Sequence, residues 1–217
     1  HTFEEVIGVL EGCFDSGKRA VKRADRNTGR LKKPAHQVMN LPVKQAHWIG
    51  GGSAFSFRDP RRFAMYLMNN ILGGPGMNSR LNMNIRERYG FTYNIESSYT
   101  PYRDTGLFAV YLATEQKHLE RTVGLVNKEF RKLREVKIGT AQLAMHKTQM
   151  KGQIAIAQEN RASVMLGNAK SLLNYGYPVT VEEVFKKIDE VSAAAIQEAA
   201  CSILTPEATG TLIYMPS

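Results

Sequence analysis

The sequence lacks any run of about 18 apolar residues, so we expect no segment to span a membrane. It has only two cysteines, Cys13 and Cys201, whose wide separation offers neither a disulfide framework nor a metal-binding spacing. We expect both thiols to be reduced, and a cytoplasmic location is the default. The chain begins with His1 rather than Met, so we expect a processed chain or a fragment of a longer protein, in which targeting information need not be retained.

Motifs for catalytic chemistry are also missing. The five histidines occur singly, and neither H-x-x-E-H nor H-E-x-x-H is present. We therefore assign no metal ligand and no catalytic residue in this chain, since a triad is assembled in space and not by spacing along the sequence. The stretch GGPGMNSRL, residues 73–81, lacks the Lys-Ser/Thr ending of a phosphate-binding loop, which argues against phosphate binding.

The net charge of +9 is typical of a nucleic-acid-binding protein, but its distribution is not. Residues 18–33 carry eight Lys and Arg side chains and one Asp, a net +7, so the other 201 residues total only +2. A short basic run is more often a solvated linker than a binding arm. We expect no nucleic-acid partner, and a basic binding module is the least favoured alternative.

Length and composition fit a globular chain. A chain of 217 residues, 43% of them hydrophobic, can form one large domain or two small ones. Near the N-terminus, apolar residues at helical spacing follow a capping-box pattern made by Thr2 and Glu5. We expect residues 1–17 to form an isolated helix, residues 18–38 a basic linker and residues 39–217 the main domain.

The main domain begins with strand-like residues and two predicted helices. Asp59 and Pro60 are expected to start the first helix, as its cap and first turn, and GGPG ends it. The second, residues 78–89, would end at Gly90 in a left-handed cap. In the strand that follows, we expect alternate residues to share one face: Phe91, Tyr93, Ile95, Ser97 and Tyr99.

The remaining elements complete the predicted fold class. Residues 106–114, GLFAVYLAT, are apolar on both faces, which predicts a central, covered strand, and the TPYRDT loop predicts an antiparallel hairpin before it. Helices are predicted over residues 116–135, 140–174 and 192–203, with a short helix capped by Thr180 and a final strand at ATGTLIYM. The predicted class is α+β, an antiparallel β-sheet with helices packed on one side.

Arg86 and Tyr93 are the candidate site residues, on either side of a helix-to-strand junction. A guanidinium donates a planar fork of N–H groups, and a phenol both donates and accepts, so the pair suits binding of a peptide carbonyl or an oxyanion. A structural role is the alternative for each. An arginine near a helix C-terminus interacts favourably with the helix dipole, and a tyrosine in a strand commonly packs in the core.

Residues 71–114 carry a longer pattern. A glycine-rich turn, Ser-Arg-Leu, Ile-Arg-Glu, Gly-x-x-Tyr and Asp-x-Gly-x-Phe follow one another in order. This pattern resembles the C-terminal half of pitrilysin/insulinase-type (inverzincin) zinc peptidases, the group that includes mitochondrial-processing-peptidase-like proteins. The later stretch YPVTVEEVFKKIDEVSAAAIQEAA resembles the helix pair that precedes the last strand in that family. Pro75 departs from the pattern, where the family tends to have another glycine.

The resemblance implies two similar α+β halves closing around a substrate chamber. The missing N-terminal half, or a partner subunit, would hold zinc through H-x-x-E-H, with its Glu as general base. Arg86 and Tyr93 match an Arg and a Tyr, seven residues apart, that contact the peptide substrate in that family. Residues 1–17 would be the last helix of the preceding half. The resemblance implies a fragment that is inactive alone; a non-catalytic scaffold or partner subunit is the alternative.

Overall fold

The computed structural model describes residues 1–14 and 34–217. The chain divides into two compact units, residues 1–30 and 31–217. The basic segment 18–33 lies outside the described residues. Among the residues that are described, no helix is both long and apolar enough to cross a membrane.

The described part of the first unit is helix α1 (Phe3–Cys13). The Thr2 hydroxyl accepts a hydrogen bond from the Glu5 N–H, and the Glu5 carboxylate accepts one from the Thr2 N–H. This reciprocal pair confirms the predicted capping box. None of the helix's side chains is buried by the described residues, although its sequence is amphipathic.

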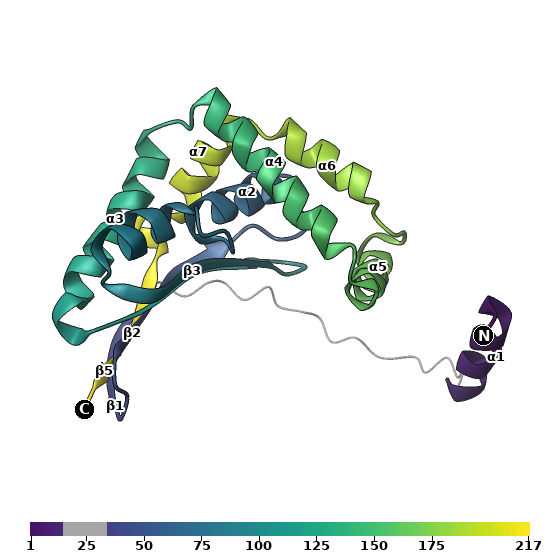
Figure 1. Ribbon diagram of the computed structural model, residues 1–217, viewed down its shortest axis with the longest axis horizontal. Helices are drawn as coiled ribbons and strands as arrows, with labels where there is room; N and C mark the ends of the chain where they lie inside the picture. Colours follow the sequence, from purple (N-terminus) through teal and green to yellow (C-terminus); the bar gives the residue numbers. More distant parts are fainter. Residues whose placement is uncertain (15–33) are drawn as a thin grey trace. The chain divides into compact units, whose positions relative to one another are not determined.

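The second unit is built on a sheet with the strand order β1-β5-β2-β4-β3 (Figure 1). Its strands are β1 (His36–Leu41), β2 (Ala46–Ala54), β3 (Thr92–Pro101), β4 (Gly106–Thr114) and β5 (Gly210–Pro216). The pairs β2–β4, β3–β4 and β2–β5 are antiparallel as predicted, but β1 runs parallel to β5. The sheet is therefore mixed. No hairpin fixes the direction of β1 against β5, because most of the domain separates them in sequence. β1 begins within the range expected to be linker.

Helices lie on one face of this sheet, so the predicted α+β class is confirmed (Figure 1). They are α2 (Arg62–Gly73), α3 (Leu119–Glu135), α4 (Thr140–Ala157), α5 (Arg161–Tyr175), α6 (Val181–Glu190) and α7 (Ala193–Ile203). The core lies between the two layers. Trp48, Phe108 and Leu112 point into it from the sheet, and Leu67 and Ile71 from α2.

Two helix boundaries differ from the sequence-based expectation. The pattern predicted as one helix over residues 140–174 is two helices, because Asn160 accepts a hydrogen bond from the Ser163 N–H and caps α5. Asp59 does not cap α2. Its carboxylate instead accepts hydrogen bonds from the backbone and guanidinium of Arg61, which holds the pKa of Asp59 below its usual range. The predicted capping box of Thr180 in α6 is confirmed.

His146 is a buried histidine in α4. Burial, reinforced by the Arg80 cation, lowers the pKa of His146 from its ordinary value. The unfolded chain therefore takes up this proton at a higher pH than the folded chain does. The contribution of neutral His146 to stability is complete above about pH 6.5 and is lost as the pH falls below that value.

We expect His146→Gln to reduce the loss of stability between about pH 7 and pH 5, because glutamine does not titrate there. Urea unfolding of both proteins across this range measures the effect. Arg80→Gln serves as a second variant, and it should flatten the same acid-side slope partly, since it removes only one of the two causes. Parallel pH profiles for wild-type protein and His146→Gln would contradict this account.

Candidate functional site

The two candidate residues flank a junction that departs from regular geometry on its helical side. Residues 82–87, the segment η1 (Asn82–Glu87), form a π-helical turn inside the predicted second helix. A π turn holds one extra residue, is rare, and is frequently found at functional sites. The helix ends at Gly90, which has φ +65° and donates its N–H to the Arg86 carbonyl at 2.9 Å. The predicted left-handed cap is therefore confirmed.

The Arg86 side chain lies at the surface beside the glycine-rich turn. Its Nη1 lies 3.2 Å from the sulfur of Met77 and 3.9 Å from a carboxylate oxygen of Glu87. A thioether is a weak acceptor, and an exposed ion pair at this distance contributes little. Among the described residues the guanidinium therefore has no strong partner, and its remaining N–H groups can donate to a ligand.

Tyr93 lies at a β-bulge. Thr92 pairs with Thr114 and Asn94 pairs with Ala113, so Tyr93 is an extra residue in the ladder between β3 and β4. Its side chain is 89% exposed. The expected face assignment is thus wrong at this position. Tyr93 does not share the buried face of Ile95, because the bulge reverses the alternation between them.

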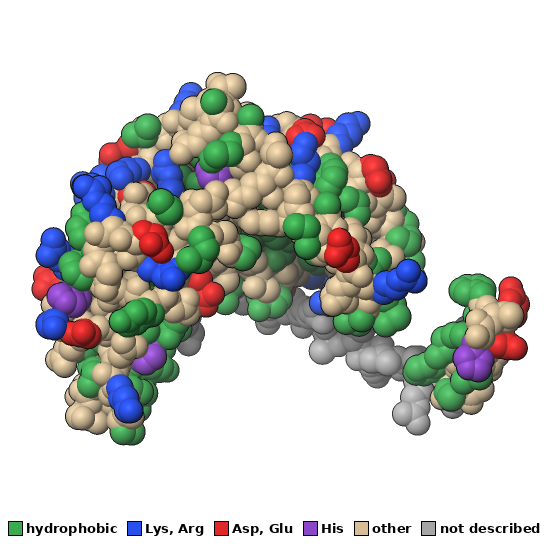
Figure 2. All heavy atoms as spheres, in the orientation of Figure 1, with side chains coloured by type: hydrophobic (Ala, Val, Ile, Leu, Met, Phe, Trp, Pro, Cys, Tyr) green, Lys and Arg blue, Asp and Glu red, His purple; other side chains and the backbone are tan. Residues whose placement is uncertain are grey.

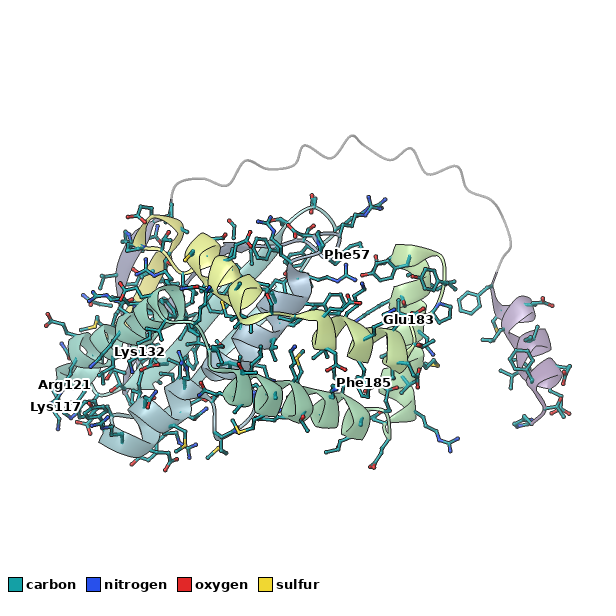
Figure 3. All side chains as sticks on the ribbon, turned by 90° about the horizontal axis from the view of Figure 1, so that it is seen from above. Phe57, Lys117, Arg121, Lys132, Glu183 and Phe185 are labelled. Atoms are coloured by element: carbon teal, nitrogen blue, oxygen red, sulfur yellow. The ribbon has the colours of Figure 1, made fainter. Side chains whose placement is uncertain are left out.

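Stacked aromatic side chains pack the junction against the residues that precede and begin α3. The rings of Tyr89 and Phe91 stack with centroids 5.4 Å apart, and Phe91 stacks on His118 at 4.5 Å. The Arg121 guanidinium lies over both Tyr89 and Phe91, at 5.6 and 5.0 Å. Figure 3 shows Arg121 at the same end of the molecule as Lys117. This stack restrains the backbone between the two candidate residues.

The structure thus places Arg86 and Tyr93 at one junction, but no hydrogen bond joins them in the described part of the chain. Sequence reasoning missed the devices that orient them, the π turn and the bulge. The sequence alternation places Thr92 on the solvent face of the strand, and its burial is evident only from the structure.

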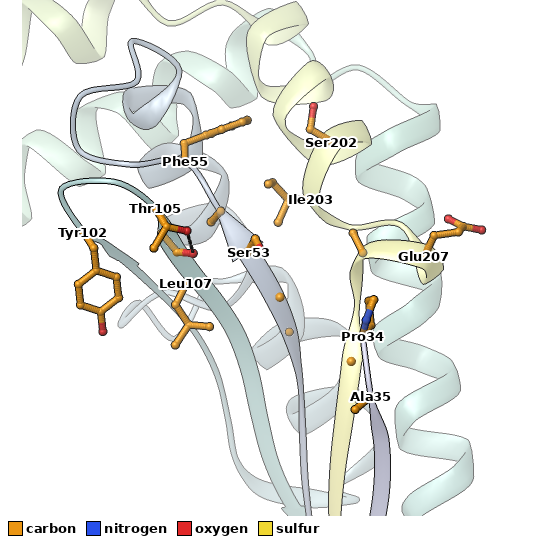
Figure 4. Close-up of a pocket in the computed structure, with 16 residues that line it drawn as sticks. Pro34, Ala35, Ser53, Phe55, Tyr102, Thr105, Leu107, Ser202, Ile203 and Glu207 are labelled. Carbon is orange, nitrogen blue, oxygen red and sulfur yellow. Dashed lines mark hydrogen bonds between the residues drawn. The ribbon is translucent and has the colours of Figure 1, made fainter. Parts of the chain in front are cut away.

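A cavity of about 910 Å³ lies elsewhere and is lined by neither candidate residue (Figure 4). It opens where β2 diverges from β5, with Phe55 and Ile203 at one end and Glu207 at the rim. No cluster of three or more metal-ligating side chains occurs within residues 1–14 and 34–217. The described residues therefore do not fit a zinc ion.

Charged side chains of both signs lie on the face of the described residues that Figure 2 shows. On the face seen in Figure 2, Lys and Arg side chains over α3 alternate with acidic ones. Ion pairs account for some of them, such as Lys132 with Glu129 and Lys117 with Glu115.

Comparison with known proteins decides the family. Residues 2–150 match the model of the peptidase M16 inactive domain. The chain belongs to the peptidase M16 family. A relative in Bacillus subtilis, "Uncharacterized zinc protease YmxG", is 28% identical over 218 residues, which cover 96% of this chain and 53% of the relative. A Rickettsia felis protein named "Uncharacterized zinc protease" is 30% identical, covering 97% of this chain and 50% of the relative.

Solved structures confirm the M16 fold. A protease from Helicobacter pylori superposes with a TM-score of 0.81 at 15% identity, covering 100% of this chain and 53% of that one. An M16 inactive domain from Pseudomonas fluorescens gives 0.73 at 24% identity, covering 86% of this chain and 45% of that one. At these identities the likeness shows the fold alone. The M16 chain spans about half the length of the curated relatives it matches.

The left-handed cap at Gly90 can be tested by substitution. We expect Gly90→Ala to destabilise the domain by about 1 kcal/mol, because a Cβ disfavours positive φ. Gly124→Ala is the matched control. Gly124 lies within α3 with open space around it, so alanine there should stabilise by up to about 1 kcal/mol. Denaturant unfolding measures both, and equal effects of the same sign would refute the assigned role of Gly90.

Proposed function

We propose that this M16 inactive domain is the C-terminal, non-zinc-binding part of a zinc metalloendopeptidase. It completes the substrate chamber, contacts the peptide through Arg86 and Tyr93, and is inactive alone. Zinc belongs to the N-terminal half of the same protein or to a partner subunit. The observation that supports this proposal best is the junction itself, where a π turn and a β-bulge present two hydrogen-bonding side chains that have no strong partner among the described residues.

The chemistry of the two side chains supports complementary roles. The Arg86 guanidinium is charged at any physiological pH and donates in a fixed plane, which suits a substrate carbonyl whose oxygen gains negative charge during peptide hydrolysis. Tyr93 extends from the sheet into open space, so its hydroxyl is free to donate to the same substrate. Leaving Met77 costs Arg86 little, because a thioether accepts weakly.

Substitution in the full-length protein tests these roles. We expect Tyr93→Phe and Arg86→Gln each to lower kcat/KM for peptide hydrolysis about 10- to 1,000-fold, the range for losing one transition-state donor. Tyr102→Phe and Arg103→Gln are matched controls, because these residues lie at the opposite end of β3, in the hairpin loop. Their activity should stay at the wild-type level.

The non-catalytic scaffold predicts a different outcome. If the residues preceding this chain in its full-length protein lack H-x-x-E-H, and no peptide is cleaved, the domain acts as a structural subunit. Unchanged kcat/KM in both site variants of an active protein would reject the substrate roles and leave the family assignment intact.

The sheet face opposite the helices is the surface that we assign to the remaining half of the protein. In the described residues no helix covers it, yet it is apolar, with Ile49 and Leu107 exposed by 39% and 49%. Two hollows of about 350 and 330 Å³ lie along it, lined among others by Ile49, Tyr111 and Leu212. A strand such as β4 that is apolar on both faces is typical of a sheet covered on both sides. The relatives are about twice as long as this chain, which supports our assignment of this face to the remaining half.

We expect Ile49→Glu and Leu107→Glu to weaken association of this chain with the separately produced remainder of the protein by at least about tenfold, because a charge would be buried without a partner. Val136→Glu, exposed at the end of α3, is the control and should associate normally. Sedimentation velocity measures assembly, and circular dichroism verifies folding of each variant. Equal association of all three variants would show that the remainder binds elsewhere.

A further inference from the structure

A single hydroxyl lies at the centre of the β-bulge that exposes Tyr93. Thr92 Oγ1 is 2.7 Å from the carbonyl oxygen of Asn94 and 2.7 Å from that of Ala113 on the neighbouring strand. The Thr92 residue is only 3% exposed, so water is no substitute for these partners. The hydroxyl carries one proton, which is therefore shared between the two carbonyls or donated to each in turn.

The residue opposite Thr92 completes the arrangement. Thr114 is also buried, and its hydroxyl donates to the Phe91 carbonyl at 2.5 Å. The two threonines thus bind backbone carbonyls on both sides of Tyr93, at residues 91 and 94. A bulge leaves ladder groups without their regular partners, and buried carbonyls without hydrogen bonds are costly. Thr92 supplies a donor that a regular ladder would not need.

The direction of Tyr93 depends on this bulge. In a regular strand Tyr93 would share the face of Ile95, Ser97 and Tyr99, which are buried against the helices. With the extra residue, Thr92 occupies the buried face and Tyr93 extends on the other side. Loss of the bulge would turn the Tyr93 hydroxyl toward the core, away from any ligand.

We propose that Thr92 is a positioning residue, whose hydroxyl holds the bulge that directs Tyr93 toward the substrate. This inference rests on the proposed substrate role of Tyr93. Thr92 itself is buried, so it touches no substrate and acts only through its neighbour. Valine has the shape of threonine without the hydroxyl, and serine keeps the hydroxyl without the methyl group, so the two variants separate hydrogen bonding from packing.

The structural part of the test is hydrogen exchange in this domain. In Thr92→Val, protection of the amides of residues 93 and 94 should fall about tenfold, the effect of losing one hydrogen bond. Protection of residues 98–100, farther along β3, should not change. Thr92→Ser should retain wild-type protection at all of these amides. An equal loss along the whole strand, or no rescue by serine, would show a general packing role and overturn the proposal.

The functional part is a double-mutant cycle in the full-length protein. Thr92→Val should lower kcat about tenfold with little change in KM, and Thr92→Ser should restore it. In a Tyr93→Phe background, Thr92→Val should have no further effect, because the hydroxyl that it would misplace is already gone. The positioning role would be overturned if the effects of the two substitutions on kcat were fully additive. It would also be overturned if Thr92→Val left kcat unchanged while Tyr93→Phe lowered it.

The two parts separate this inference from the proposed function. If Tyr93→Phe leaves hydrolysis unchanged, or the full-length protein cleaves no peptide, the substrate role of Tyr93 fails. The exchange measurement then still decides whether the Thr92 hydroxyl holds the bulge. If exchange at residues 93 and 94 is unaltered in Thr92→Val, the inference fails whatever the kinetics of Tyr93→Phe.

Discussion

Packing of the sheet against the helices on one face is the constraint on which the rest of the domain depends. Trp48, Phe108 and Leu112 are almost completely buried, and they meet Leu67 and Ile71 of α2 across the same core. Because side chains alternate along a strand, this packing sets the register of the sheet, and a shift of one residue would move every side chain to the wrong face. Departures from regular alternation are therefore tolerated only where other contacts stabilise them.

Two irregular features of the described residues lie between residues 82 and 93, and they contain the two candidate residues. The π turn at residues 82–87 and the bulge at Tyr93 each contain one residue more than regular structure requires. Their cost is offset by the hydroxyls of Thr92 and Thr114 and by the aromatic stack on His118. Irregular geometry supported by specific contacts is the usual condition of a functional site, where local rules are broken and compensated nearby.

The M16 assignment gives this irregular junction a context. The chain matches the inactive domain of the family, spans about half of its curated relatives, and has no metal-ligating cluster among its described residues. Within the described residues, Tyr93 and an apolar face of the sheet are exposed, and our proposal assigns them to contacts with substrate and with the rest of the protein. In the function that we propose, this domain contributes hydrogen-bond donors to the substrate, and the metal is bound by the other half.

Local signals in the sequence were sufficient for the capping boxes at Thr2 and Thr180, the end of a helix at Gly90, the β3–β4 hairpin and the α+β class, because each depends on neighbouring residues or a short period. The choice of Arg86 and Tyr93 also came from the sequence, through the spacing of a longer pattern. Their orientation did not. Tyr93 is exposed because it is an extra residue in β3 relative to β4. The bulge is defined by the pairing of its neighbours with Thr114 and Ala113, which are distant in the sequence. The parallel pairing of β1 with β5 likewise depends on contacts between segments far apart in the sequence, so no local pattern predicts it.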